Sequence, residues 1–494
     1  MKKAILYILL LSQTTLLSCS KWLDVQPESD IDRDILFTTE EGFKEALLGI
    51  YTRNAKTDLY GKELTIGTTE VLAQNYKIKP FDRPKYLATK NYRYDDADFM
   101  QRKDAIWLGL YSGIVNANLI LAEIDQKQNL FTAGNYALIK GETLALRGYL
   151  HFDALRLFAP AYLVNPEAAA IPYVTSYSNK TTAMSKVKDV LDSVIADLEQ
   201  AKELLTDDPI RKSSYIIGYP SADTLTNTEL HDKSLFLQNR RHRLNFYAVC
   251  GALARVYLYK GDKTNALANA KIVIDAKKFP WTNKTDFLQP DADKKDRILY
   301  KELLFGWYIP SLNNEINIST FSDPAVDGIY LSDDDVKSIY ETGGAGGSDM
   351  RFTQWFSGLN GTEKTIQKYR RNPVGDTFIA NKHYLMAPAL RLSEVYYIAA
   401  ECTYEADPDA ALAYLDEVRL HREIGDKVKA ANLSEFQTEL LKEYRKETYA
   451  EGQLFYAYKR LNKPIIGFQG EIIPASQRIF VLPLPDDEII YGER

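Results

Sequence analysis

Small and apolar residues recur at three- and four-residue steps through residues 253–275, on both sides of a short polar turn. Residues at such steps share one face of an α-helix, so the pattern predicts two short amphipathic helices. Gly261-Asp262 lies where the chain must reverse, and small residues let the two helix backbones approach closely. The positions predicted to face the partner helix are Ala254, Tyr257, Leu258 and Gly261 before the turn, and Ala266, Ala270, Val273 and Ile274 after it.

The hairpin pattern occurs again along the chain. Residues 392–419 repeat it, with Ala400 and Ala411 in the places of Ala254 and Ala266. Each unit resembles one tetratricopeptide (TPR) unit, a helix–turn–helix that cannot bury its apolar face without stacked neighbours. The alternative is a generic antiparallel helical bundle. Further helices of this kind are predicted at residues 142–158, with a partner at 187–205, and at residues 106–124.

The pattern therefore predicts a mainly α fold, an alpha-alpha superhelix of TPR-like hairpins packed as one body. Because units spread over the chain would share one core, we expect a single domain over residues 36–494. The TPR-like units fall near 106–205, 244–275 and 390–419, and an irregular region that could carry ligand loops covers 279–385.

Between the repeats the pattern predicts long irregular loops and a few short strands. The expected elements are a helix over 40–51, a long ordered loop over 72–99, a strand over 302–309, a helix starting at Ser332, one amphipathic helix over 435–461, and an extended strap over 479–488. With 61 basic against 67 acidic residues, the net charge of −6 leaves no basic footprint for nucleic acid.

The N-terminus resembles a bacterial lipoprotein signal. Lys2-Lys3 precede a mostly apolar segment over 4–17 that is too short to span a bilayer, and Cys19 follows it. We predict cleavage of residues 1–18, lipidation of Cys19, a tether over 19–35 and membrane attachment through the lipid alone. Ordinary secretory cleavage is the alternative. Cys250 and Cys402 fall on predicted helices as core thiols, and the sequence leaves a disulfide between them open.

Several segments occur in one order along nearly the whole chain: Trp22-Leu23-Asp24-Val25-Gln26-Pro27 after Cys19, Phe37-Thr38-Thr39-Glu40-Glu41, Ala46 to Tyr51, the helix over 142–158, the hairpin over 253–274, residues 390–419, Tyr444-Arg445-Lys446-Glu447 with Glu451-Gly452-Gln453, and Val481-Leu482-Pro483-Leu484-Pro485. Together these segments resemble the SusD/RagB family of Bacteroidetes outer-membrane lipoproteins. Three positions, Tyr444, Leu454 and Ala457, depart from charged residues of the family pattern and bear on a buried charge pair, not on the fold.

The resemblance implies a nutrient-binding lipoprotein on the outer membrane, exposed at the cell surface. Such a protein captures glycan, or peptide in some relatives, and passes it to a SusC-like TonB-dependent transporter. It uses no catalytic residue and no cofactor. A glycan-degrading surface lipoprotein and a TPR scaffold that binds only protein are the alternatives from other classes.

Motifs for catalysis and metal binding are absent from the sequence. The five histidines form no HExxH pair and no metal spacing with cysteine, and His151 lies on an apolar helix as a core residue. Asp291-Ala292-Asp293 starts like a calcium loop, but Lys295 and Asp296 replace a ligand and the required glycine. We therefore predict no bound metal.

A glycan site needs flat aromatic rings that cover sugar faces and polar side chains that bond the rim, held on ordered loops. Two regions qualify, the loop over 72–99 and the chain around and after the strand over 302–309. The alternative for each ring is an ordinary place in the core. The predicted ligand-binding residues are Tyr76, Tyr92, Trp307, Tyr308, Asn313 and Tyr330.

Overall fold

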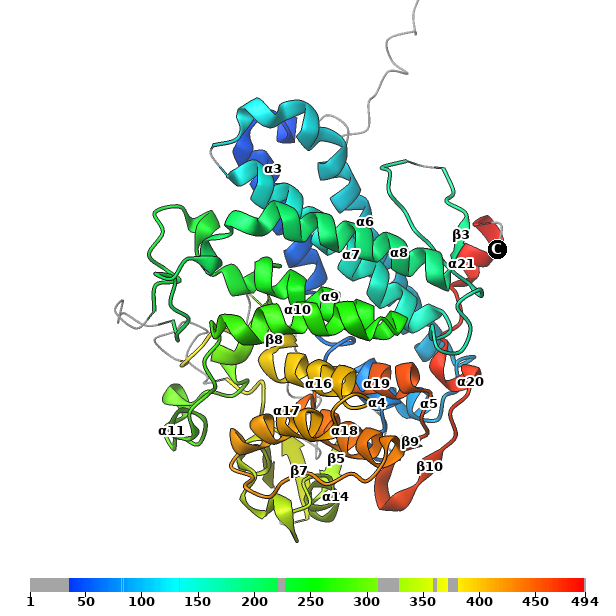
Figure 1. The fold of residues 1–494 in the computed structure, drawn as a ribbon. Coiled ribbons are helices and arrows are strands. Elements are labelled where there is room, and N and C mark those ends of the chain that lie inside the picture. The colour runs from blue at the N-terminus through cyan, green and yellow to red at the C-terminus, as the bar shows by residue number, and fades with distance from the viewer. Residues whose placement is uncertain are drawn as a thin grey trace, which may run out of the picture.

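Antiparallel helical pairs make up most of the molecule (Figure 1). The computed structural model describes residues 35–492 except 81, 83, 133, 179, 221–226, 310–327, 359–361 and 372–380, so the predicted leader, Cys19 and Asn313 lie outside the described residues. The helices are α3 (Glu40–Asn54), α4 (Thr68–Leu72), α5 (Leu87–Lys90), α6 (Ala97–Ile124), α7 (Asn135–Phe158), α8 (Val187–Leu204), α9 (Phe246–Lys260), α10 (Lys263–Ala276), α11 (Lys284–Phe287), α14 (Asp333–Ile339), α15 (Met350–Trp355), α16 (Leu392–Thr403), α17 (Pro408–Leu420), α18 (Leu433–Glu447), α19 (Leu454–Leu461), α20 (Gln477–Phe480) and α21 (Asp486–Tyr491).

The two predicted hairpins are confirmed, and both use the same device at the turn. Gly261 ends α9 with a φ of 83°, which glycine adopts without strain, and Asp262 caps α10 by accepting from Asn265 N at 3.0 Å. Asp407 caps α17 in the same way, accepting from Ala410 N at 3.0 Å. An aspartate between paired helices therefore sets where each second helix begins.

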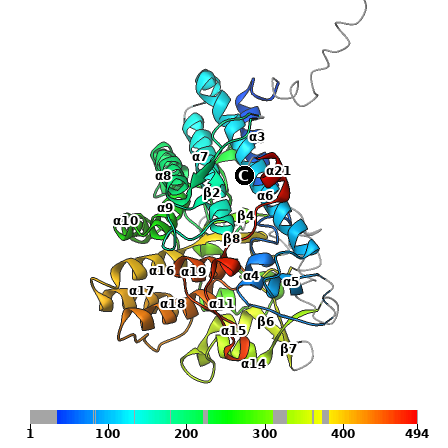
Figure 2. The same cartoon turned by 90° about the vertical axis from the view of Figure 1, so that its right-hand side faces the viewer.

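The hairpins stack into one body. Helix α7 packs on α6 and α8, α8 on α9, α10 on α16, and α16 on α17, so neighbours in the stack follow the order of the chain. Figures 1 and 2 show the pairs layered from α7 and α8 at one end to α17 and α18 at the other. One continuous hydrophobic core runs through these layers. The mainly α, TPR-like architecture agrees with the prediction.

Short strands accompany the helices. Strand β4 carries the predicted strand over 302–309 and pairs antiparallel with β8, while β1, β5, β7 and β6 form an antiparallel sheet in that order. Helix α14 begins at Ser332 as predicted, through a capping box with Asp335. The strands are β1 (Lys77–Ile78), β2 (Ala169–Pro172), β3 (Met184–Lys186), β4 (Leu303–Tyr308), β5 (Ile329–Ser332), β6 (Phe356–Gly358), β7 (Glu363–Ile366), β8 (Met386–Arg391), β9 (Ile465–Ile466) and β10 (Ile472–Ile473).

One predicted element was wrong in its continuity. The segment over 435–461 is two helices, because α18 ends at Glu447 and α19 begins at Leu454. Gly452 lies between them with a φ of 72°, and a Cβ there would come within 2.2 Å of the Leu64 carbonyl oxygen. The helix therefore breaks where Gly452 packs closely against residue Leu64 of the same chain. The amphipathic pattern of residues 435–461 gives no sign of this contact. The segment over 72–99 likewise contains β1, α5 and the start of α6 rather than loop alone.

The C-terminal segment crosses the helical body as a strap. Leu482 N donates to the Leu157 carbonyl at 3.0 Å, and Lys103 Nζ donates to the Leu484 carbonyl at 3.1 Å. These bonds attach residues 481–485 to α6 and α7, with α20 and α21 on either side. The predicted extended strap is confirmed over residues 481–485 only, because residues 479–480 belong to α20 and residues 486–488 to α21.

Helix α6 is long and apolar for a packing reason. The helical stretch Ala97–Leu130 has the length and composition of a membrane span, although we expected no such segment after the leader. Half of its most apolar window is buried, and α6 packs against α3 and α7. Its apolar surface therefore belongs to the core of the helical body. Cys250 and Cys402 are free thiols, and burial raises the pKa of each to about 12.

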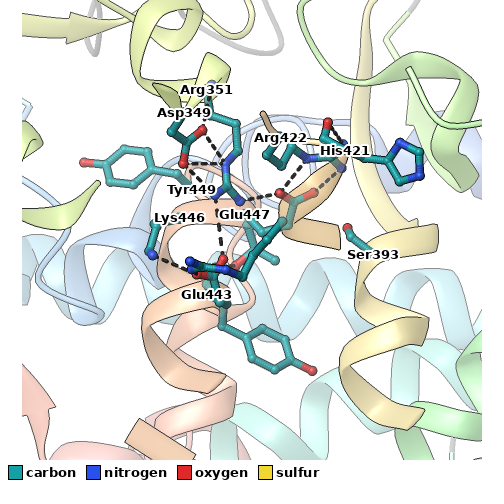
Figure 3. Close-up of polar contacts among 12 residues, drawn as sticks. Asp349, Arg351, Ser393, His421, Arg422, Glu443, Lys446, Glu447 and Tyr449 are labelled. Atoms are coloured by element: carbon teal, nitrogen blue, oxygen red, sulfur yellow. Dashed lines mark hydrogen bonds and ion pairs between the residues drawn. The ribbon is translucent and has the colours of Figure 1, made fainter. Parts of the chain in front are cut away.

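The buried carboxylate of Glu447 connects the helical repeats to the irregular segments that lie between them. Glu447, at the end of α18, is fully buried and accepts hydrogen bonds from three arginines. Arg351 Nη1 lies 2.6 Å from its Oε2, Arg422 Nη2 lies 2.7 Å from its Oε1, and Arg391 Nη1 also donates to Oε1. Figure 3 shows Arg351 and Arg422 reaching Glu447. The carboxylate thus joins α15, β8 and the chain after α17.

Each of these arginines has a second acidic partner. Asp349 pairs with Arg351 at 2.6 Å, Glu302 with Arg422 at 2.6 Å, and Glu451 with Arg391 at 2.9 Å. All of these side chains are at most 5% exposed, so solvent does not screen the pairs. Tyr444, Leu454 and Ala457 are themselves buried. The departures from the family pattern therefore coexist with an extensive buried charge cluster.

The cluster makes stability depend on acid pH. Burial alone would raise the pKa of Glu447, but Arg422, Arg391 and Arg351 lower it well below 4.5. Burial also opposes ionisation of Glu443, and Lys446, Arg351 and Arg419 lower its pKa to about 2. The folded state therefore binds fewer protons than the unfolded state in this range. The stabilisation is present above about pH 4.5 and is lost as the pH falls toward 2.

We predict that Glu447→Gln lowers the free energy of unfolding by about 3–5 kcal/mol, because it leaves three buried guanidinium groups short of negative charge. Urea denaturation at pH 7 measures this loss. The control is Glu439→Gln on the same helix, which removes one surface pair with Lys442 and should cost less than about 1 kcal/mol. Equal effects of the two substitutions would contradict the structural role of Glu447.

Candidate functional site

The predicted site residues of β4 point to opposite faces of the strand. Trp307 is 1% exposed, and its ring stacks on Tyr60 with centroids 4.3 Å apart and planes at 12°. Tyr308, the next residue, is 38% exposed. Successive side chains of a strand alternate between faces, so one ring enters the core while the other reaches the surface. Trp307 therefore belongs to the core, and the ring of Tyr308 is accessible from the surface.

The other predicted rings lie around β1, away from β4. Tyr76 is 2% exposed and packs edge-on against Tyr449, so its ring belongs to the core. Tyr92 is half-buried, and its hydroxyl donates to the Leu72 carbonyl at 2.8 Å. Tyr330 lies on β5 opposite Lys77, with Lys79 Nζ 5.3 Å from its ring centroid. The structure therefore divides the predicted residues between two regions.

Tyr308 opens onto a cavity of about 430 Å³, which we name the Tyr308 cavity. Helix α3 forms one wall, and residues 235–243 form another. Two leucines leave apolar surface uncovered here, with Leu48 43% and Leu235 82% exposed. Lys44, Gln238 and Asn239 add polar groups to the lining. The lining thus combines an aromatic ring, aliphatic surface and hydrogen-bonding side chains.

Three rings form a cluster at this cavity. The rings of Tyr308 and His242 stack with centroids 5.0 Å apart and planes at 15°. Tyr384 meets Tyr308 edge-on at 5.7 Å and His242 at 5.1 Å. Such stacked and edge-on pairs hold each ring in a fixed orientation. The exposed ring of Tyr308 is therefore supported from behind and presents a rigid flat surface.

His242 is neutral at physiological pH. Burial lowers its pKa to about 3, and the charges of Arg241 and Arg243 act in the same direction. Its buried Nε2 has no hydrogen-bond partner within the described part of the chain. A neutral imidazole stacked on Tyr308 supports an uncharged ligand better than it supports proton transfer.

A cationic wall lies beside the rings. Arg243 is buried, its guanidinium carbon lies 4.2 Å from the centroid of Phe236, and its Nη1 lies 3.8 Å from Glu142 Oε1. Lys44 pairs with Glu40 and Glu41 at 2.7 Å each. These contacts hold the cationic groups of Arg243 and Lys44 in fixed positions. A ligand hydroxyl could therefore bond to them without a movement of the side chains.

Sequence reasoning named Tyr308 as a candidate, but it did not include the residues that surround Tyr308 at the cavity. His242 and Tyr384 come from segments far apart in the chain and have no periodic pattern that would link them. The uncovered leucines of α3 and of residues 235–237 look like ordinary core residues in the sequence. No signal in a single sequence pairs them, because their meeting depends on how α3 packs beside residues 235–243.

Metal chemistry finds no support in the described residues. No group of three or more His, Cys, Asp and Glu side chains within 35–492, apart from its gaps, is arranged to hold a metal ion. His151 is a core residue as predicted, with its Nε2 accepting from Val174 N at 2.9 Å. The buried charge cluster around Glu447 is inaccessible to a ligand because its members are buried.

Comparison with known proteins agrees with this architecture. Residues 21–216 match a SusD-like family described as starch-binding and associating with the outer membrane, and residues 349–484 match the SusD family. A SusD-like protein of Formosa agariphila is 29% identical over 206 residues, which are 41% of this chain and 37% of that relative's length.

Solved structures share the fold along nearly the whole chain. A SusD superfamily protein from Bacteroides thetaiotaomicron is 21% identical with a TM-score of 0.70, covering 92% of this chain and 98% of that one. A structure described as a SusD-like carbohydrate binding protein from Bacteroides vulgatus is 17% identical with a TM-score of 0.69, covering 92% and 97%. The two family matches, over residues 21–216 and 349–484, together cover more than half of the sequence, so the chain belongs to the SusD family.

Proposed function

We propose that this chain is a cell-surface lipoprotein that captures oligosaccharide in the Tyr308 cavity and delivers it unchanged to a SusC-like TonB-dependent transporter. The observation that carries the proposal is the exposed ring of Tyr308, held by His242 and Tyr384 at the edge of a cavity. A sugar ring has an apolar face and a hydroxyl rim. The flat ring suits the face, and the amides and cations of the lining suit the rim.

The size of the cavity fits a short oligosaccharide. Small-ligand sites commonly measure roughly 300–1,000 Å³, and this one measures about 430 Å³. Its walls come from a helix and from chain anchored to the stacked body, so little ordering is needed when a ligand binds. Names of relatives support the same chemistry, since one solved neighbour is described as a carbohydrate binding protein.

The carboxylates of the cavity favour binding over hydrolysis. Glu41 and Glu45 line it, and both are exposed on one face of α3. Glu41 pairs with Lys44 at 2.7 Å. Glycoside hydrolysis needs two carboxyl groups that flank the bond from suitable sides, one of them kept protonated. Two exposed acids on a single helix face do not supply that arrangement.

The proposed location rests on the N-terminus and on the family description. Cys19 follows a leader-like segment, and the SusD-like match is described as associating with the outer membrane. Acyl chains on Cys19 would hold the helical body at the membrane, at about 0.8 kcal/mol for each buried methylene. We place the body at the cell surface, where the transporter partner would receive the ligand.

We predict that Tyr308→Ala weakens oligosaccharide binding about tenfold, because it removes the stacking surface. Its free energy of unfolding should change by less than about 1 kcal/mol. Isothermal titration with a panel of neutral oligosaccharides measures the affinity, and Tyr491→Ala is the control, since Tyr491 is 72% exposed and does not line the cavity. Unchanged affinity in Tyr308→Ala would refute the assignment.

The same titrations, extended to peptides and to the purified transporter and followed by analysis of the sugars for cleavage, separate the alternatives. Release of shorter sugars would mean an enzyme, saturable binding of peptides alone would mean a peptide receptor, and binding to a transporter without any small ligand would mean a scaffold.

We predict that Trp307→Ala acts on the fold instead. Removing this core ring should lower the free energy of unfolding by about 3–5 kcal/mol, because the ring is enclosed by Tyr60, Phe305 and Tyr149. Urea denaturation measures the loss. A stable Trp307→Ala variant that binds no sugar would instead place this ring in the ligand site.

We predict that Cys19 carries the lipid. Cells fed labelled palmitate should incorporate it into the wild-type protein and not into Cys19→Ser, and the variant should leave the membrane fraction. Cys402→Ser is the control, because that thiol belongs to the helical body. Equal labelling of Cys19→Ser and wild type would contradict lipidation at this position.

A further inference from the structure

Basic residues gather at a second cavity that shares no lining residue with the Tyr308 cavity. This basic cavity measures about 390 Å³ and lies between residues 292–297, residues 353–357 and residues 367–371. Its lining includes Lys295, Arg297, Arg370 and Arg371, and among described residues it includes no Asp or Glu. The concentration of positive charge runs against the net charge of −6 of the whole chain.

Arg297 differs from the arginines of the core. It is 7% exposed, and within the described residues its guanidinium donates one long hydrogen bond, from Nη2 to the Ala292 carbonyl at 3.4 Å. Arg240, by contrast, is fully buried and donates to both Glu142 and Asp208. A buried guanidinium without a carboxylate is costly, so the position of Arg297 calls for an anion.

The neighbouring cations increase that need. In the described part of the chain neither Lys295 nor Arg370 pairs with a carboxylate, and Arg370 Nη1 donates only to Gln367 Oε1 at 3.1 Å. Burial lowers the pKa of Arg297 to about 10, with the charge of Arg370 acting in the same direction. Burial and the charge of Arg297 lower the pKa of Lys295. These charges repel one another, and an anion between them would remove the repulsion.

A neutral donor at the same cavity is also unused. Gln354 is 9% exposed, lines the basic cavity and has no hydrogen-bond partner for its buried Nε2 among the described residues. Buried amide donors in folded proteins are nearly always satisfied, so an unsatisfied one at a cavity indicates a missing acceptor. An oxyanion would satisfy both the unused donor of Gln354 and the charges of the cations.

We propose that the basic cavity binds the oxyanion of an acidic sugar, a carboxylate or a sulfate ester, on the glycan that this protein captures. The identity of the carrier rests on the proposed function, whereas the recognition of an oxyanion rests on the cavity itself. Arginine presents its donors as a planar fork that matches carboxylate and sulfate oxygens. Arg297 supplies these donors from the buried side of the cavity, and Gln354 adds a neutral donor. Arg370 contacts the ligand at the exposed edge of the cavity.

Isothermal titration of the full mature chain tests the proposal with five probes: digalacturonate, galactose 6-sulfate, inorganic phosphate, galactose and maltotriose. We expect digalacturonate or galactose 6-sulfate to bind at least tenfold more tightly than galactose, with an affinity that falls as salt is raised. The two acidic probes distinguish a carboxylate from a sulfate ester. Binding of inorganic phosphate alone, without either acidic sugar, would overturn the assignment to a glycan.

Two substitutions locate the binding. Arg297→Gln and Arg370→Gln should each weaken binding of the acidic sugar about tenfold to a hundredfold, since charge-assisted hydrogen bonds have this strength. Binding of maltotriose should stay unchanged in both. Arg478→Gln is the charge-matched control, because Arg478 is exposed and does not line the cavity. Full affinity for the acidic sugar in both cavity variants would overturn the proposal.

We expect both arginine variants to fold, so a loss of binding would not reflect a loss of structure. Arg297→Gln removes a buried charge that has no carboxylate partner among the described residues, so its melting temperature should equal or exceed that of the wild type, and Arg370 is exposed. Binding of maltotriose with no binding of any anionic probe would overturn this inference and leave the proposed function standing. Binding of acidic sugars without maltotriose would support it and remove the role proposed for Tyr308.

Discussion

The architecture depends on one carboxylate that three arginines share inside the protein. Glu447 stands at the end of α18, and the arginines come from α15, from the end of β8 and from the chain after α17. A hydrophobic contact would tolerate sliding between these segments, because burial has no direction. Charged hydrogen bonds in a dry interior do not, since each donor must meet a particular oxygen. The cluster therefore sets how the irregular chain docks on the helical repeats.

That rigidity decides where ligands can be held. The irregular segments between the hairpins pack against the helical body, and both candidate cavities are lined in part by residues of these segments. At one, Tyr308 is supported by His242 and Tyr384 and offers a flat uncharged surface. At the other, Arg297 lies buried beside Lys295 and pairs with no carboxylate of the described residues. A scaffold that loses little freedom on binding can use such fixed groups efficiently. The two cavities differ in chemistry, since one is lined by aromatic and aliphatic side chains and the other by basic ones.

Local rules predicted the repeating elements well because those rules act within a few residues. Small residues at helical spacing and an aspartate after each first helix marked both hairpins, and Asp262 and Asp407 cap the second helices as that pattern requires. The capping box at Ser332 was readable for the same reason. The predictions failed where a segment far away in the sequence packs against the predicted element. The helix over 435–461 breaks because Gly452 closely approaches the Leu64 carbonyl, a neighbour nearly four hundred positions away.

The helical period, the turns and the resemblance to a family could all be recognised from the amino-acid sequence. Each of them depends on residues close together in the chain or on motifs in a fixed order. The sequence also placed an aromatic pair at Trp307 and Tyr308 without deciding which ring faces a ligand. Packing in three dimensions settles that Trp307 stacks on Tyr60 while Tyr308 reaches the surface, and that Arg297 is buried with no acidic partner in the described part of the chain. Exposure and charge pairing depend on which distant segments pack together, and no local pattern carries that information.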